Sequence, residues 1–202
     1  RNLFNSGLTS SLRLTLSWDT RNNRLFPSDG VLATASTEVS DNALLSTSNF
    51  IRHYLNLRLY KPLWGPFVGK LNAQWGLVTS RDGQGVPIYE RYFLGGITDV
   101  RGFPIQSLGP YLGIPSTFSD PSYQTVNPRG EQFGGNMQFY YNLEVEFPLI
   151  EAVGIKGVVF HDAGNAWNLE DTLCSPEPQF DDEAAAPCGV DLLRLRTSWG
   201  FG

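Results

Sequence analysis

The sequence predicts an all-β protein, an antiparallel transmembrane β-barrel of which about seven strands lie on this chain. Three observations predict this fold. Apolar and polar residues alternate with period two in every patterned segment, short connections take turns with long ones, and aromatic residues gather near the segment ends. Short turns at one end, long loops at the other and strands of about 9–11 residues are typical of outer-membrane barrels.

Seven segments carry the alternation. In the first, Leu12, Leu14 and Leu16 share one face, while Arg13 and Thr15 share the other. The apolar faces are nearly free of charge and the polar faces carry charges in mid-strand, which favours a barrel over an ordinary sandwich. No helical periodicity competes with this pattern. The predicted strands cover residues 11–19, 31–39, 54–60, 70–77, 139–147, 156–162 and 193–201.

The connections between these segments alternate in length. The short ones contain proline, glycine or Asp-Gly signals for turns, and they lie near 20–30, 61–66 and 148–154. The long ones lie near 40–52, 80–136 and 164–190. This alternation predicts that the turns lie at one end of the barrel and the long loops at the other.

Composition limits the class of protein. The 202 residues are enough for one domain, 1–202, in which 13% of the residues are aromatic and 17% are charged. A net charge of −5 and a pI near 5.0 argue against a nucleic-acid partner, because such proteins carry a basic footprint. No apolar run approaches the 18 residues of a transmembrane helix, which argues against a helical membrane protein.

Few residues could carry out catalysis or bind a metal. The histidines are His53 and His161, and His161 points to the opposite face of its strand from Asp162, so the two make a poor catalytic pair. The Gly-x-Ser-x-Gly elbow of many hydrolases is missing from the sequence. We therefore expect no enzyme activity, no cofactor and no metal site, and a soluble β-rich hydrolase is the least favoured alternative.

The two cysteines lie close together in a stretch rich in acidic residues, proline and alanine. Cys174 and Cys188 are expected to form a disulfide in an oxidising compartment, or else to remain two separate thiols. No metal-ligand spacing accompanies them.

The segment 80–136 is the longest connection, and its composition is unlike that of a disordered linker. It contains aromatic residues and three glycines, Gly95, Gly96 and Gly102, where the backbone can need positive φ or a close approach. A connection this long inside an ordered domain is usually functional. We expect it to fold inward and to contact the rest of the chain through Arg101.

Four stretches resemble one known family. The first, Tyr92-Phe93-Leu94-Gly95-Gly96 followed by Val100-Arg101-Gly102-Phe103, is similar to the long-loop motif of the BamA family of outer-membrane barrel-assembly insertases. The others resemble the family's periplasmic turn and the two strands after its long loop, and they lie in the same order at 26–30, at 134–136 leading into 143–147, and at 160–167. The resemblance covers nearly the whole chain, as the C-terminal half of such a barrel.

The resemblance implies an architecture and a contact. It implies a barrel of sixteen strands, with periplasmic POTRA domains and the gate between first and last strands outside this chain. It also implies that the loop 80–136 folds into the barrel, where its arginine meets acidic residues of the inner wall, here Glu146 and Asp162. The strand phases place both carboxylates on inward faces. An arginine fork can bind two carboxylates and stays charged.

The function that the resemblance implies is that of a non-enzymatic insertase in the bacterial outer membrane. Its partners would be the lipid bilayer, unfolded outer-membrane protein clients and accessory lipoproteins. Two alternatives remain open. A two-partner protein-secretion pore of the same superfamily shares the loop motif, although the Gly134-Gly135-Asn136 block favours the insertase. A passive porin is less favoured, because it does not account for an arginine motif with paired acids.

Overall fold

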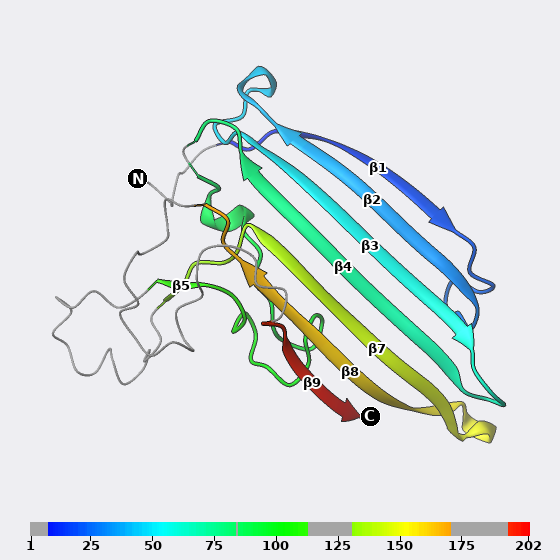
Figure 1. Ribbon diagram of the computed structural model, residues 1–202. Helices are drawn as coiled ribbons and strands as arrows, with labels where there is room; N and C mark the ends of the chain where they lie inside the picture. Colours follow the sequence, from blue (N-terminus) through cyan, green and yellow to red (C-terminus); the bar gives the residue numbers. More distant parts are fainter. Residues whose placement is uncertain (1–7, 84, 113–130, 171–193) are drawn as a thin grey trace, which may run out of the picture.

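The computed structural model describes residues 8–83, 85–112, 131–170 and 194–202. Seven strands form one antiparallel sheet in the order β1-β2-β3-β4-β7-β8-β9 (Figure 1). They are β1 (Ser11–Asp19), β2 (Gly30–Ser40), β3 (Phe50–Pro62), β4 (Val68–Ser80), β7 (Met137–Ile150), β8 (Ile155–Trp167) and β9 (Arg196–Phe201). A separate pair, β5 (Tyr111–Leu112) and β6 (Glu131–Gln132), lies within the connection between β4 and β7.

The predicted fold class is confirmed, because each of the seven predicted strands is present. The first has the predicted limits, whereas the third and fourth extend further, to 13 residues each. The simple alternation stops early there because Phe50 and Val78 are apolar residues on the polar face, where the β4–β7 connection buries both completely. The last strand begins at Arg196, later than predicted.

The two faces of the sheet differ as the alternation predicts. On the outer face, Leu12, Leu14, Leu16 and Trp18 of β1 are each at least 66% exposed. Residues of this kind, aligned across antiparallel strands, form a broad apolar surface suited to contact with lipid. His161 lies on this face too, stacked on Tyr141 with the ring centroids 5.8 Å apart.

The buried core lies between the inner face of the sheet and the β4–β7 connection. One cluster joins Leu94, Val100 and Leu108 of the connection to Tyr140 and Ala166 of the sheet. The other joins Val86 of the connection to the Phe50 and Val78 side chains, with Tyr92 packed against it. Residues 86–108 of the connection are therefore packed on the sheet.

Among the described residues there are also three short 3-10 helices: η1 (Asn42–Leu44), η2 (Ile88–Glu90) and η3 (Glu151–Val153). In the described part of the chain, no helix combines the length and the apolar character needed to cross a membrane. Cys174 and Cys188 fall outside the described residues, so their disulfide stays a prediction.

Candidate functional site

Arg101 lies in the part of the β4–β7 connection from Asp99 to Gly102, which we call the loop tip, and it binds Asp162 of β8. Its Nε donates to Oδ2 of Asp162 at 2.7 Å and its Nη2 donates to Oδ1 at 2.7 Å, so the pair is bidentate. The Arg101 backbone N–H also donates to Oδ2 at 3.0 Å. The Asp162 side chain is completely buried, and a buried carboxylate of this kind requires a paired charge.

One transverse row of the sheet holds the backbone of the loop tip. Asn142 on β7, Asp162 on β8 and Ser198 on β9 lie directly opposite one another in register. Asn142 Nδ2 donates to the Asp99 carbonyl at 2.6 Å, and the Ser198 hydroxyl donates to the Arg101 carbonyl. Together with the Arg101 N–H bond to Asp162, these contacts bind the tip through its main chain as well as through its side chain.

A second carboxylate and an aromatic ring complete the surroundings of the Arg101 guanidinium. Nη1 lies 2.7 Å from Oε1 of Glu144 on β7. Cζ lies 3.6 Å from the centroid of the Phe160 ring, which is a cation–π contact. The planar guanidinium thus uses its donors on two carboxylates and its face on an aromatic ring, a combination that lysine does not provide.

The expectation that Glu146 pairs with Arg101 is wrong. The Glu146 carboxylate instead binds Lys70 of β4 and Lys156 of β8, with Oε1 at 2.7 Å from the Lys156 Nζ. Glu144 and Glu146 share the inward face, but the residue opposite Asp162 is Asn142, so Glu144 is one step away and Glu146 is two. Glu146 is therefore four residues from Asn142, about 13 Å along the strand, which puts it beyond the reach of the Arg101 guanidinium.

Val100 and the glycines of the motif fit the wall closely. Val100 is completely buried, and a Cβ added to Gly164 of β8 would lie 2.9 Å from its Cγ2. The wall therefore uses a glycine where the valine packs. Gly95 has a φ of +109°, and a Cβ there would meet the Pro104 carbonyl oxygen at 2.4 Å. Gly96 and Gly102 also have positive φ, and Phe103 packs against the cluster around Val100.

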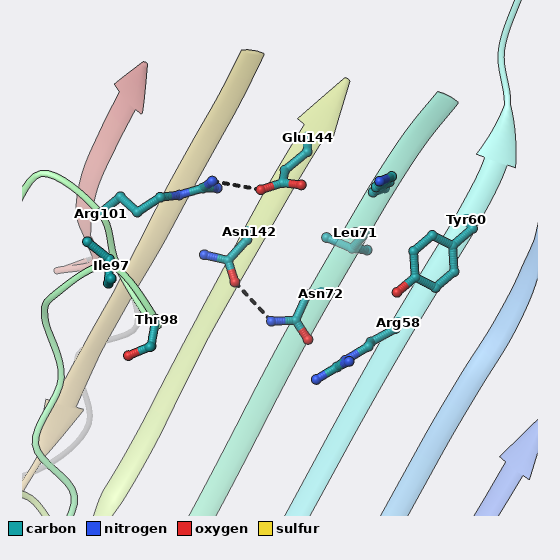
Figure 2. A pocket seen from close by; sticks show the side chains of 10 residues that line it. Arg58, Tyr60, Leu71, Asn72, Ile97, Thr98, Arg101, Asn142 and Glu144 are labelled. Carbon is teal, nitrogen blue, oxygen red and sulfur yellow. Dashed lines mark hydrogen bonds and ion pairs between the residues drawn. The ribbon is translucent and has the colours of Figure 1, made fainter. Parts of the chain in front are cut away.

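A cavity of about 240 Å³ lies beside the Arg101 side chain on the inner face (Figure 2). Figure 2 shows Arg101 reaching from the connection to Glu144 on β7, and Asn72 of β4 donating to Asn142 at 2.9 Å. Arg58 of β3 and Thr98 of the connection also line the cavity. Its polar lining is typical of a wet barrel interior.

The electrostatics of the loop tip favour a charged Arg101. Its side-chain bonds to Asp162 raise the pKa of Arg101 above its ordinary value, although partial burial opposes this effect. Burial raises the pKa of Asp99, while a hydrogen bond from Thr98 opposes the rise. Among the described residues, no group of three His, Cys, Asp or Glu side chains could hold a metal ion. The arrangement can hold a loop, but it offers no paired nucleophile and base.

Sequence reasoning did not identify several residues that hold the connection. Besides Glu144, Asn142 and Ser198, these include Arg91, whose side chain is completely buried, and its partner Glu170. The sequence gives little indication that these residues are buried or paired, since a charged residue in a loop is usually solvated. The adjacent opposite charges Glu90 and Arg91, next to the aromatic residues Tyr92 and Phe93, were the one visible indication.

Comparisons with known proteins identify the family of the chain. The family model described as "Omp85 superfamily domain" matches residues 4–202. The outer membrane protein assembly factor BamA of Nitratidesulfovibrio vulgaris is 25% identical over 201 residues, which cover 96% of this chain and 23% of that protein. The sorting and assembly machinery component 50 homolog of Mus musculus is 28% identical over 169 residues, covering 80% of this chain and 32% of that protein.

A solved structure is similar as well. The crystal structure of BamA from Haemophilus ducreyi lacking POTRA domains 1–3 matches with a TM-score of 0.74 and 25% identity, covering 95% of this chain and 35% of that chain. This chain therefore spans about a third or less of the length of these relatives. With a family model matched over nearly all its residues and a BamA barrel as structural neighbour, the chain belongs to the Omp85 superfamily, as part of a BamA-like barrel.

Proposed function

We propose that the protein of which this chain is a part folds and inserts β-barrel proteins into the bacterial outer membrane, without catalysing a covalent reaction. Its similarity to an outer membrane protein assembly factor over 96% of the chain supports this role. Similarity to sorting and assembly machinery components of animals supports the assembly role more broadly. Because animal relatives are similar too, the bacterial location is part of the proposal.

The observation that carries the proposal is the contact of Arg101 with Asp162 and Glu144 on the inner face of the sheet. In the proposed mechanism this contact braces the barrel wall from inside. A braced wall keeps its shape while the strands at the gate separate and pair with the strands of an incoming client, as in β-augmentation. Glu146 has no part in the brace, because it is held by lysines.

The proposed partners follow from this role. The complete barrel has sixteen strands, and the segment 80–136 is its inward-folding loop. The clients are unfolded outer-membrane proteins, and the lipid bilayer contacts the outer face of the sheet. POTRA domains and accessory lipoproteins deliver the clients from the periplasmic side. The broad apolar outer face with Leu12, Leu14 and Leu16 supports the lipid contact.

The test uses the full-length protein reconstituted in liposomes with an unfolded β-barrel client. The rate of client folding is followed by heat-modifiable gel mobility, for the wild type, Arg101→Ala and the control Arg24→Ala, whose side chain is 85% exposed. We expect Arg101→Ala to slow insertion several-fold and Arg24→Ala to have no effect. Equal rates for the wild type and Arg101→Ala would contradict the bracing role. Transport of a client through the membrane without its insertion would favour a secretion pore.

A further inference from the structure

We propose that Glu90 and Arg91 form a strut, a pair of side chains that fixes the β4–β7 connection at the end of the sheet where β4 and β8 end. This attachment is independent of Arg101. These two adjacent, oppositely charged residues bind oppositely charged residues from separate parts of the wall. Glu90 binds Arg52 of β3, and Arg91 binds Glu170, three residues after the end of β8. In Figure 1, η2, which ends at Glu90, lies at the same end of the sheet as the arrowheads of β4 and β8.

The Arg91 end of the strut is a fully buried guanidinium with a set of acceptors around it. Its side chain has no exposed surface, and its Cζ lies 5.5 Å from the Phe133 ring centroid. The acceptors of its N–H groups are the Val86 carbonyl at 3.0 Å, the Asn168 Oδ1 at 3.1 Å, the Gly134 carbonyl at 3.4 Å and the Glu170 carboxylate. An ammonium group has three donors on one atom and cannot reproduce this planar spread.

These acceptors join the two arms of the connection. Val86 lies near its start and Gly134 near its end, so one side chain binds both. Tyr92 and Gly135 strengthen the same junction, because each donates its N–H to the carbonyl of the other at 2.8 Å. Glu170 Oε1 accepts the Val86 N–H at 3.0 Å. A Cβ on Gly134 would lie 2.9 Å from the Arg91 Cβ, so glycine is required for the approach.

The Glu90 end is a chain of alternating charges that crosses three strands. Arg13 of β1 lies 2.6 Å from Glu38 of β2, and Glu38 lies 3.2 Å from Arg52 of β3. Arg52 then binds the Glu90 carboxylate and also donates to the Glu90 carbonyl at 3.0 Å. The side chains of Arg52 and Glu90 are partly exposed, so this end is less buried than the Arg91 end.

The two attachment points explain why Glu90 and Arg91 carry opposite charges. Arg52 lies on β3 and Glu170 follows β8; two strands, β4 and β7, lie between them in the sheet, so β3 and β8 are about three strand spacings, or roughly 14 Å, apart. Glu90 would be repelled by Glu170, and Arg91 would be repelled by Arg52. The order of the two charges therefore fixes which way the connection crosses the inner face.

The strut and the Arg101 brace have no wall residue in common. Arg101 uses Asp162, Glu144 and the main-chain row, whereas Arg91 uses residues beyond the end of β8. Removing one should therefore leave the other in place. The strut rests on the proposed function only for its purpose, which is to hold the loop over the wall that Arg101 braces.

The test is hydrogen exchange measured by mass spectrometry on the full-length protein in lipid nanodiscs. The variants are Arg91→Gln, Arg91→Lys, Glu90→Gln and the exposed control Arg24→Gln. We expect Arg91→Gln to accelerate exchange in peptides covering Val86–Tyr92 at least tenfold, which corresponds to about 1.4 kcal/mol. Arg91→Lys should give an intermediate effect. Glu90→Gln should give a smaller one, since the bond from Arg52 to the Glu90 carbonyl remains.

The same experiment separates positioning from general stability. Peptides from β3 and β8, and the peptide containing the Arg101 amide, should exchange as in the wild type. Unchanged exchange at Val86–Tyr92 in Arg91→Gln would overturn the strut, and so would equal acceleration in the strands or at Arg101. If Arg91→Gln does not assemble, Glu170→Gln removes the charge at the far end but keeps an acceptor for Val86, and it must accelerate the same peptides.

Client insertion by the same preparations distinguishes the strut from the proposed function. Accelerated exchange confined to the connection establishes the strut whether or not insertion slows. Unchanged insertion would then show that insertion does not depend on the strut, whereas the bracing function is tested separately by Arg101→Ala, which removes the contacts with Asp162 and Glu144.

Discussion

Replacing Arg101 by alanine should destabilise the barrel by an amount that the structure allows to be worked out. The change leaves the completely buried Asp162 carboxylate without its two side-chain donors. Removing one partner of a buried pair costs about 3–5 kcal/mol. Arg101 is 24% exposed and the backbone N–H at position 101 still donates to Asp162, so the lower limit of about 3 kcal/mol applies.

The assay is the temperature at which half of the full-length protein loses its folded, faster gel mobility. A loss of about 3 kcal/mol lowers this midpoint by roughly 6–12 °C for a cooperative unit of 150–250 residues, and by less for a complete barrel of sixteen strands, because the shift falls as the unit grows. The control Arg24→Ala removes an exposed charge 3.7 Å from Asp19 and should change stability by less than about 0.5 kcal/mol.

A double variant tests the physical reason. If the cost comes from the unpaired Asp162 carboxylate, removing that carboxylate as well should restore part of the stability, because no buried charge is then left alone. The double variant Arg101→Ala with Asp162→Ala should therefore melt above Arg101→Ala alone. A midpoint for Arg101→Ala equal to that of the wild type, or additive losses in the double variant, would refute the reasoning.

Three further predictions concern the surroundings of this pair. Glu144→Gln should lower the same midpoint and increase protease cleavage of the loop, whereas Glu146→Gln should leave cleavage unchanged, because its carboxylate binds lysines. Gly164→Ala should cost about 1–3 kcal/mol, since the new Cβ would lie 2.5 Å from the Tyr140 Cβ and 2.9 Å from the Val100 Cγ2. A wild-type midpoint would contradict this close packing. Burial raises the pKa of Tyr92 from 10.0 to about 12, so the folded state favours the neutral phenol. The melting midpoint should therefore fall as the pH rises from about 10 to about 12, and Tyr92→Phe should remove this pH dependence.

The sequence predicted the strands well because their pattern reflects a simple physical requirement. A strand between lipid and a wet interior must alternate, and the limits of β1 follow directly from Leu12, Leu14, Leu16 and Trp18. The alternation fails where the β4–β7 connection covers part of the inner face of the sheet. Phe50 and Val78 are apolar on the polar face because the connection covers them, and a two-sided rule cannot anticipate that cover.

The candidate site could be predicted in part, for a similar reason. The two-residue period of the alternation shows which face of the sheet a carboxylate occupies, and it places Glu144, Glu146 and Asp162 on one face. It does not state which of them the loop reaches, because that depends on the register of β7 against β8. Arg91 could not be assigned at all, since its buried position depends on acceptors at Val86, Gly134 and Glu170 that are distant in sequence.

The central claim, that the loop tip lies against the inner wall, is tested most directly by a disulfide cross-link in intact cells. A Cβ at Gly102 lies 3.2 Å from the Ser198 Cβ, within a few tenths of an ångström of the separation that a disulfide requires. In full-length protein with Cys174→Ser and Cys188→Ser, the pair Gly102→Cys and Ser198→Cys should form a cross-link that a reductant reverses.

The matched control pairs Gly102→Cys with Thr197→Cys, because residue 197 is the neighbour on the opposite face of β9. We predict a reducible mobility shift on non-reducing gels for the Ser198 pair and none for the Thr197 pair. A missing shift for the Ser198 pair, or an equal shift for both pairs, would contradict a loop bound to the inner wall.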